Sequence, residues 1–162
     1  MLECQGSNEV FSELCSLFSN NLLDHLHTFH WIARVKDKSS ELGEKVWLRL
    51  CEAMHAVPSL NIHSLRIPNS NIGEKGCKEF EKLCFHSKLQ EIEDLDLSGN
   101  RIGNAGFCSL FRTFQLVDVV SRIRLLDLSK NRIGAQGIKD AYAHLKQCYF
   151  RNLETLRLGC CS

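Results

Sequence analysis

The chain has 162 residues, and its 20 lysine and arginine residues are nearly balanced by 19 aspartate and glutamate residues. This length suits about one domain with a sizeable core. The balanced charge gives no electrostatic basis for binding nucleic acid or an anionic membrane. No apolar run approaches the roughly 18 residues of a membrane span, and the first residues lack the layout of a signal peptide. We therefore expect a cytoplasmic protein whose partners are neither nucleic acids nor membranes.

Cysteine and histidine are the two residue types that first suggest chemistry. The nine cysteines are scattered and odd in number, so we expect reduced, buried thiols of the kind found in cytosolic proteins. His25, His27 and His30 invite a zinc interpretation, because closely spaced histidines ligate this metal. No further ligand follows at a recognisable spacing, so we prefer a solvated or partly packed trio and predict no metal and no cofactor.

Residues 7–22 carry apolar side chains at the spacing of an amphipathic helix, with Ser7 or Asn8 as a suitable N-cap. The inner face is Val10, Phe11, Leu14, Cys15, Leu17, Phe18 and Leu22. A stack of repeats needs a lid over its first cross-section. We therefore assign residues 1–25 to an N-terminal helical cap.

Residues 26–59 are either a degenerate first repeat or a continuation of the cap. Leu26, Phe29 and Trp31 have the 0, 3, 5 spacing of the later repeats, which favours a short strand, although the same residues also suit a longer first helix. We prefer the strand, followed by a polar loop at residues 34–40.

A second helix is expected from about Glu41 to Ala56, because Pro58 disfavours helix at the residue before it. Its inner face is Leu42, Val46, Leu50, Cys51 and Met54.

Residues 60–162 contain a repeat with a period of 30 or 31 residues. Its most similar copies begin at Leu95 and Leu126 and share Leu, Asp, Leu, Ser, Asn, Arg, Ile and two Gly residues within twelve positions. Each copy starts with three apolar residues at the 0, 3, 5 spacing, namely Ile62, Leu65, Ile67; Ile92, Leu95, Leu97; Ile123, Leu126, Leu128; and Leu153, Leu156, Leu158. A fixed period in this range is typical of stacked repeats. We count three full copies and a final partial one.

Each copy continues with Ser70, Asn100, Asn131 or Cys161, then an isoleucine, a glycine and a helical stretch in the full copies. This pattern resembles the leucine-rich repeat family, and within it the long-repeat, ribonuclease-inhibitor-like branch. Ser70 departs from the Asn or Cys of the family motif, and the chain ends before a helix follows Leu158. The resemblance implies an α/β solenoid, a right-handed horseshoe with short parallel strands inside and helices outside.

The residue pattern leads to the same fold independently of the resemblance. No single copy buries its own apolar face, so the copies stack and their strands form a parallel sheet. Strands lie about 4.8 Å apart and helices are about 10 Å wide, which puts the strands on the inside of a curve. Buried amides of Asn100 and Asn131 are expected to pair with backbone groups that the turns leave unpaired.

Function is expected on the concave face, where outward side chains of successive strands form columns. One column reads Arg66, Asp96, Asp127 and Arg157, and a second reads Ser64, Asp94, Leu125 and Thr155. Either each aspartate pairs with its neighbouring arginine on an exposed face, or Asp94, Asp96 and Asp127 form an acidic patch for a basic segment of a partner. No catalytic residue is expected, since no nucleophile, base or phosphate-binding loop follows a known pattern.

We therefore predict a non-catalytic protein-interaction module that presents its concave sheet to a protein partner. An alternative comes from the resemblance alone: some proteins with this repeat type activate small GTPases, and Arg101 and Arg132 are the loop residues to test for such a role. A third alternative is a structural fragment of a larger repeat protein. The uncapped edge at Leu156 and Leu158 also suggests self-association or a partner, because an open edge strand invites pairing.

Overall fold

The structure is a computed structural model that describes residues 2–5, 13–17, 25–32, 40–58, 60–86, 88–117, 120–148 and 150–159. Strands and helices alternate along most of the chain. In order they are β1 (Leu2–Gln5), β2 (Thr28–Ile32), α2 (Ser40–Ala56), β3 (Ser64–Arg66), α3 (Gly73–Phe85), β4 (Asp94–Asp96), α4 (Gly103–Leu116), β5 (Leu125–Asp127), α5 (Ala135–Leu145) and β6 (Thr155–Arg157). A helical segment at residues 13–17 precedes β2.

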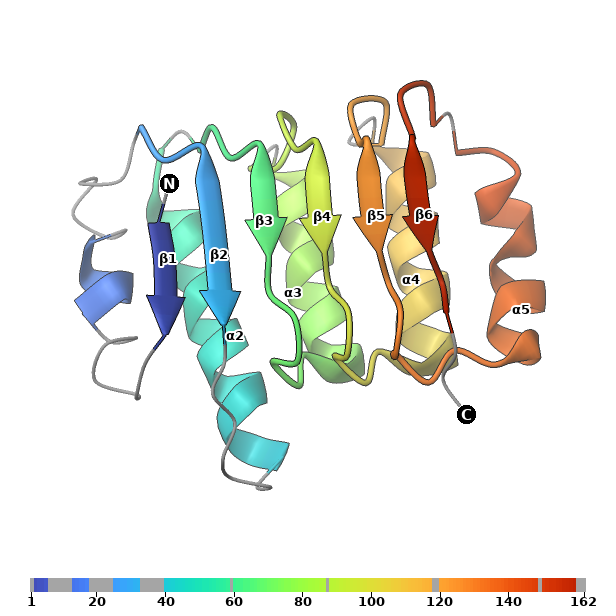
Figure 1. The fold of residues 1–162 in the computed structure, drawn as a ribbon, viewed down its shortest axis with the longest axis horizontal. Coiled ribbons are helices and arrows are strands. Elements are labelled where there is room, and N and C mark those ends of the chain that lie inside the picture. The colour runs from blue at the N-terminus through green and yellow to red at the C-terminus, as the bar shows by residue number, and fades with distance from the viewer. Residues whose placement is uncertain are drawn as a thin grey trace.

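The six strands form one parallel sheet in the order of the chain. Figure 1 shows the strands side by side with α2, α3 and α4 behind them, and α5 beyond β6. Every connection from β2 onward passes from the carboxyl end of one strand through a helix to the next strand. The predicted α/β solenoid of stacked repeats is confirmed.

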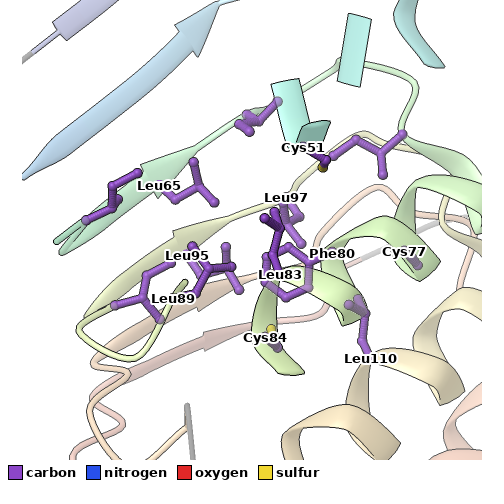
Figure 2. Close-up of a cluster of buried hydrophobic side chains, with 14 of the residues drawn as sticks. Cys51, Leu65, Cys77, Phe80, Leu83, Cys84, Leu89, Leu95, Leu97 and Leu110 are labelled. Atoms are coloured by element: carbon purple, nitrogen blue, oxygen red, sulfur yellow. The ribbon is translucent and has the colours of Figure 1, made fainter. Parts of the chain in front are cut away.

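The core lies between the sheet and the helices and repeats with the period of the sequence. In β3, β4 and β5 the middle residue is Leu65, Leu95 or Leu126, and each of these leucines has no exposed surface. Figure 2 shows Leu95 and Leu97 directed toward Phe80 and Leu83 of α3. Full burial of one such leucine stabilises the fold by roughly 1.5–3 kcal/mol. The 0, 3, 5 spacing thus predicted the buried positions of the three full copies correctly, whereas Leu156 in the final copy is 43% exposed.

Two buried asparagines join the turns of successive repeats. The side-chain oxygen Oδ1 of Asn100 accepts hydrogen bonds from the backbone N–H groups of Ser70 (2.7 Å) and Ile72 (3.4 Å). Its Nδ2 donates to the carbonyls of Ile67 (2.7 Å) and Ser98 (3.2 Å). Asn131 repeats this arrangement one turn further along, as predicted.

The N-terminal part of the chain contains one feature that the sequence did not predict. β1 adds a parallel strand to β2, within the range for which only a helical cap was expected. The preferred strand at Leu26, Phe29 and Trp31 is confirmed, because β2 covers residues 28–32 and all three side chains are buried. The predicted helix at residues 7–22 is described only at 13–17, where it is helical and Leu14 is buried; its other residues lie outside the described ranges.

Helix α2 runs from Ser40 to Ala56, close to the predicted bounds. Leu50, Cys51 and Met54 are buried, as expected. The side chains of Leu42 and Val46 and the loop before Ser40 lie outside the described part. None of the helices in the described residues is long and apolar enough to cross a membrane.

Candidate functional site

The face of the sheet opposite the helices carries the predicted columns of outward side chains. Strand register aligns Arg66 with Asp96, Asp96 with Asp127, and Asp127 with Arg157. The same register aligns the second column, Ser64, Asp94, Leu125 and Thr155. In the described part of the chain no helix or strand lies in front of this face (Figure 1). The predicted arrangement of these side chains is therefore correct.

Two further residues extend the columns and were missed in the sequence. Register places Thr28 beside Ser64 and His30 beside Arg66. The His30 ring nitrogen Nε2 lies 3.1 Å from the Ser64 hydroxyl oxygen. Both residues could have been found from the sequence. If Leu26, Phe29 and Trp31 face the core at the 0, 3, 5 spacing, Thr28 and His30 lie on the opposite face of the strand.

Ion pairs on this face follow the expected chemistry but not entirely the expected partners. Arg157 Nη1 donates to Asp127 Oδ2 at 3.3 Å, a neighbouring pair within the column, as predicted. Arg66 Nη2 instead donates to Asp94 Oδ2 at 3.0 Å, a diagonal contact, so the prediction that Arg66 pairs with Asp96 is wrong. With side chains 40% and 34% exposed, the Arg66–Asp94 pair contributes at most about 0–1 kcal/mol.

Asp96 is hydrogen-bonded within its own turn. Its Oδ1 accepts a hydrogen bond from the backbone N–H of Ser98 at 2.9 Å. Aspartate commonly bonds the backbone two residues on, and this needs little side-chain ordering. Asp127 makes the equivalent bond to the Ser129 N–H at 3.0 Å. Both carboxylates thus stabilise the turn at the end of their strand.

Asp127 differs from Asp96 because it is almost completely buried, with 7% of its surface exposed. Burial alone raises the pKa of its carboxyl group, but hydrogen bonds from Ser129 and the charge of Arg157 outweigh this effect and lower the pKa below its ordinary value. Asp127 therefore stays ionised and contributes little accessible negative surface.

The predicted acidic patch is thus mostly neutralised. Asp94 and Asp127 each face an arginine, and among the described residues only Asp96 of the three makes no ion pair. Half-buried Leu125 supplies the apolar position of these columns, and Thr155 lies beside it. Among the described residues of the two columns, from Ser64 to Arg157, the face offers one carboxylate without an ion pair, one apolar side chain and several hydrogen-bonding groups.

Arg101 and Arg132 lie outside the columns, in the loops after β4 and β5. Both are exposed, and both have a left-handed backbone with φ of 54° and 57°. Each arginine directly follows a buried asparagine, Asn100 or Asn131, and belongs to the turn rather than to the strand. The two sets of predicted site residues are therefore on adjoining surfaces.

The histidines are brought together differently from the expected trio. His27 Nδ1 and His63 Nδ1 each lie 3.1 Å from the carbonyl oxygen of Asn61, and their rings are 5.2 Å apart. A carbonyl only accepts, so both rings carry a proton on Nδ1. The described residues include no group of three or more side chains arranged to hold a metal ion.

Six of the described cysteines are free thiols, and burial makes several of them harder to ionise. Burial raises the pKa of Cys77 to about 12 and that of Cys148 to about 11, and it raises the pKa values of Cys51 and Cys84 as well. The thiolate is the reactive form of cysteine, so the buried Cys51, Cys77 and Cys84 are packing residues, whereas Cys148 is half-buried.

Comparison with known proteins identifies the repeats. A family model described as leucine-rich repeat matches residues 89–107 and 123–140, which cover the β4 and β5 strands, their turns and the starts of α4 and α5. No curated protein matches the chain. Two matched repeats, together with alternating helices and parallel strands in one open sheet, identify the fold as a leucine-rich-repeat solenoid, an architecture that generally serves protein interaction.

Proposed function

We propose that this protein is a non-catalytic interaction module that presents the concave face of its sheet, including Asp96 and Leu125, to a protein partner. The observation that supports this proposal is a sheet face without a covering element in the described residues, on which charged side chains are held by hydrogen bonds to their neighbours. A preordered surface loses less conformational entropy when it binds.

The partner is expected to place a basic group beside Asp96. Asp96 lies between Arg66 and Asp127 in the column, and its two nearest carboxylates already have arginine partners. A lysine or arginine of the partner would form an ion pair with the Asp96 carboxylate. Leu125 would supply an apolar contact on the adjacent strand.

The test is quantitative affinity capture from the source cell with Asp96→Asn as bait. Asparagine keeps the oxygen that accepts the Ser98 N–H and removes only the charge. We expect the variant to lose about tenfold of the captured partner, since about 1.4 kcal/mol corresponds to this factor. Asp140→Asn, an exposed carboxylate on α5, is the matched control and should retain the partner. Equal capture by wild type and both variants would eliminate the acidic contact.

Finer assignments belong to the same proposal. The long period of the repeats, each with a helix of 11–14 residues after its strand, supports the ribonuclease-inhibitor-like branch. Free thiols among the described cysteines support a cytoplasmic location. Residues 1–25 remain our proposed cap, with β1 as part of it.

Self-association through β6 is a second proposed use of the molecule. Leu156 is 43% exposed, whereas Leu65, Leu95 and Leu126 at the same position of other strands are fully buried. A second copy that covers β6 would remove this apolar surface from water. Light scattering that finds only monomers at high protein concentration would contradict it. The GTPase-regulating alternative remains a prediction for Arg101 and Arg132 alone.

A further inference from the structure

Three cationic residues lie together at the carboxyl edge of the sheet, on the loops that follow β4 and β5. Arg101, Lys130 and Arg132 are all exposed. Within the described part of the chain, none of the ion pairs involves any of them. No carboxylate in these ion pairs therefore neutralises their charges.

The backbone of all three residues is left-handed, with φ between 54° and 57°. This conformation costs a residue other than glycine roughly 1–2 kcal/mol, so the turn must hold it. Asn131 does so for Arg101, because its Oδ1 binds the N–H groups on both sides, those of Asn100 and Ile102. Lys130 is held by its N–H bond to the Gly159 carbonyl at 3.0 Å.

Repetition sets the distance between the two arginines. Arg101 and Arg132 occupy the same position of adjacent turns, which the bond from Gly103 N–H to the Asn131 carbonyl joins at 2.9 Å. Adjacent strands lie about 4.8 Å apart, so the two side chains start from backbone positions with about this separation. Lys130 is two residues before Arg132. Together they form a compact group, which we name the cationic ridge.

The helices add positive potential at the same edge. α3, α4 and α5 all begin there, at the lower side of the sheet in Figure 1, and in none of them does the N-cap residue's own side chain bond the helix backbone. At α5 the Gly134 N–H donates to Asn104 Oδ1 at 2.9 Å, a neutral partner that adds no negative charge. Helix N-termini carry a partial positive charge. The first turn of α3 contains Glu74, whereas the first turns of α4 and α5 contain no acidic residue. The Glu74 carboxylate also reaches the start of α4, since its Oε1 would lie 3.4 Å from a Cβ on Gly103. The positive potential is therefore least compensated at the start of α5, beside Lys130 and Arg132.

We propose that the cationic ridge binds a short acidic segment of a protein, with Arg101, Lys130 and Arg132 contacting its aspartate or glutamate carboxylates. Guanidinium groups bind carboxylates through paired hydrogen bonds, and charged bonds of this kind are about twice as strong as neutral ones. The net charge of the whole chain is only +1, which favours a short acidic peptide over a long polyanion such as a nucleic acid. This binding surface is separate from the sheet face and does not depend on it.

The experiment measures binding of a fluorescent hexaglutamate peptide by anisotropy. The test variant carries Arg101→Asn, Lys130→Asn and Arg132→Asn. The chain itself has Asn71 and Asn69 at the equivalent positions, with φ of 51° and 54°, so asparagine suits these turns. The matched control carries Lys78→Gln, Lys139→Gln and Lys146→Gln, and removes the same charge. All three lysines are exposed, the first two on helices and Lys146 at the C-cap of α5.

We expect the loop variant to weaken binding of the peptide about tenfold or more, and the control and Asp96→Asn to stay within about twofold of wild type. Wild-type binding should weaken when salt rises from about 50 to about 200 mM. The proposal is overturned if wild type does not bind hexaglutamate, or if both triple variants lose binding equally. Tighter ridge-dependent binding of an oligonucleotide of equal charge would also overturn it, in favour of nucleic acid.

Discussion

Single side chains connect each turn of this solenoid to the next. Asn100 and Asn131 each bond two backbone N–H groups and two backbone carbonyls. Each asparagine thus gives four backbone groups a hydrogen-bond partner, and an unpaired buried group would destabilise the fold. Ser70 stands at the same position, and within the described part of the chain its hydroxyl bonds only the Pro68 carbonyl of its own turn. The strongest connections between turns are therefore those of β4 and β5, where the exposed side chains of the candidate site are also found.

Asp127 makes the stability of this part depend on pH. Its pKa is lowered in the folded protein, because the bonds from Ser129 and the charge of Arg157 outweigh burial. A lowered folded pKa stabilises the fold above the unfolded pKa, and this contribution is lost as the pH falls through the folded value. We expect Asp127→Asn to be less stable than wild type near neutral pH, with a difference that shrinks below about pH 4. Urea unfolding of both proteins from about pH 7 to about pH 3 measures this.

An Arg157→Gln background is the control for this effect. One of the groups that favours the Asp127 charge is then absent, so Asp127→Asn should cause a smaller loss near neutral pH. Parallel stability curves for wild type and Asp127→Asn over the whole pH range would show that the carboxylate contributes nothing by its charge.

The columns of outward side chains could be predicted from the sequence, but the ion pairs between them could not. Alternation along a strand and a fixed repeat determine which residues face outward and which are neighbours, so the Arg66, Asp96, Asp127 and Arg157 column was correct. The ion pairs depend on side-chain rotamers, which the alternation does not determine. Arg66 has two carboxylates on the adjacent strand and bonds Asp94, whereas Arg157 bonds Asp127, although Asp96 and Asp127 accept the same turn hydrogen bond.

At the scale of elements, α2 and α3 are fixed by a tight contact between Trp47 and Gly76. The Trp47 indole is buried, and its Nε1 donates to the Gly76 carbonyl at 2.9 Å. A Cβ on Gly76 would lie 2.6 Å from the Trp47 ring and 2.3 Å from Ile72 Cγ2. The ring is rigid and enclosed, so the two helices would have to separate.

Gly76→Ala should therefore destabilise the protein by about 1–3 kcal/mol, the usual effect of overpacking. Gly134→Ala is the matched control, because its Cβ would lie 3.9 Å from the nearest atom, Asn104 Oδ1, and its φ of −91° suits any residue. The control should stay within about 0.5 kcal/mol of wild type in urea unfolding. If both variants unfold at the same urea concentration, the contact does not restrict the helices.

The elements that the sequence missed lack a repeated pattern. Trp47 lies on the buried face of α2, a helix that precedes the clear sequence repeat of residues 60–162. β1 was not predicted because a four-residue segment, Leu2–Gln5, carries too little periodicity to identify a strand. Where the period is strong, from β3 to β6, the predicted apolar triplets coincide with the observed strands.

At the scale of the whole molecule, the repeats are unequally buried. α4 contributes six buried residues, including Phe107, Phe111 and Phe114, whose rings lie 4.7–5.5 Å apart along the chain. α5 contributes two, Gly137 and Ala141, while Tyr142 is 63% exposed. In a stack of repeats, stability is the sum of each repeat and its contacts with its neighbours. α5 and β6 should therefore open before α4.

Native-state hydrogen exchange at low protein concentration tests this order. Amides of α5, residues 135–145, should exchange at least about tenfold faster than those of α4, residues 103–116, because local opening follows local burial. A second copy on β6 would cover Leu156 and lower the opening of this end, so raising the protein concentration should slow exchange in α5 and β6 and leave α4 unchanged. Equal protection of α4 and α5 at every concentration would mean that the solenoid unfolds as one cooperative unit and that β6 gains no partner.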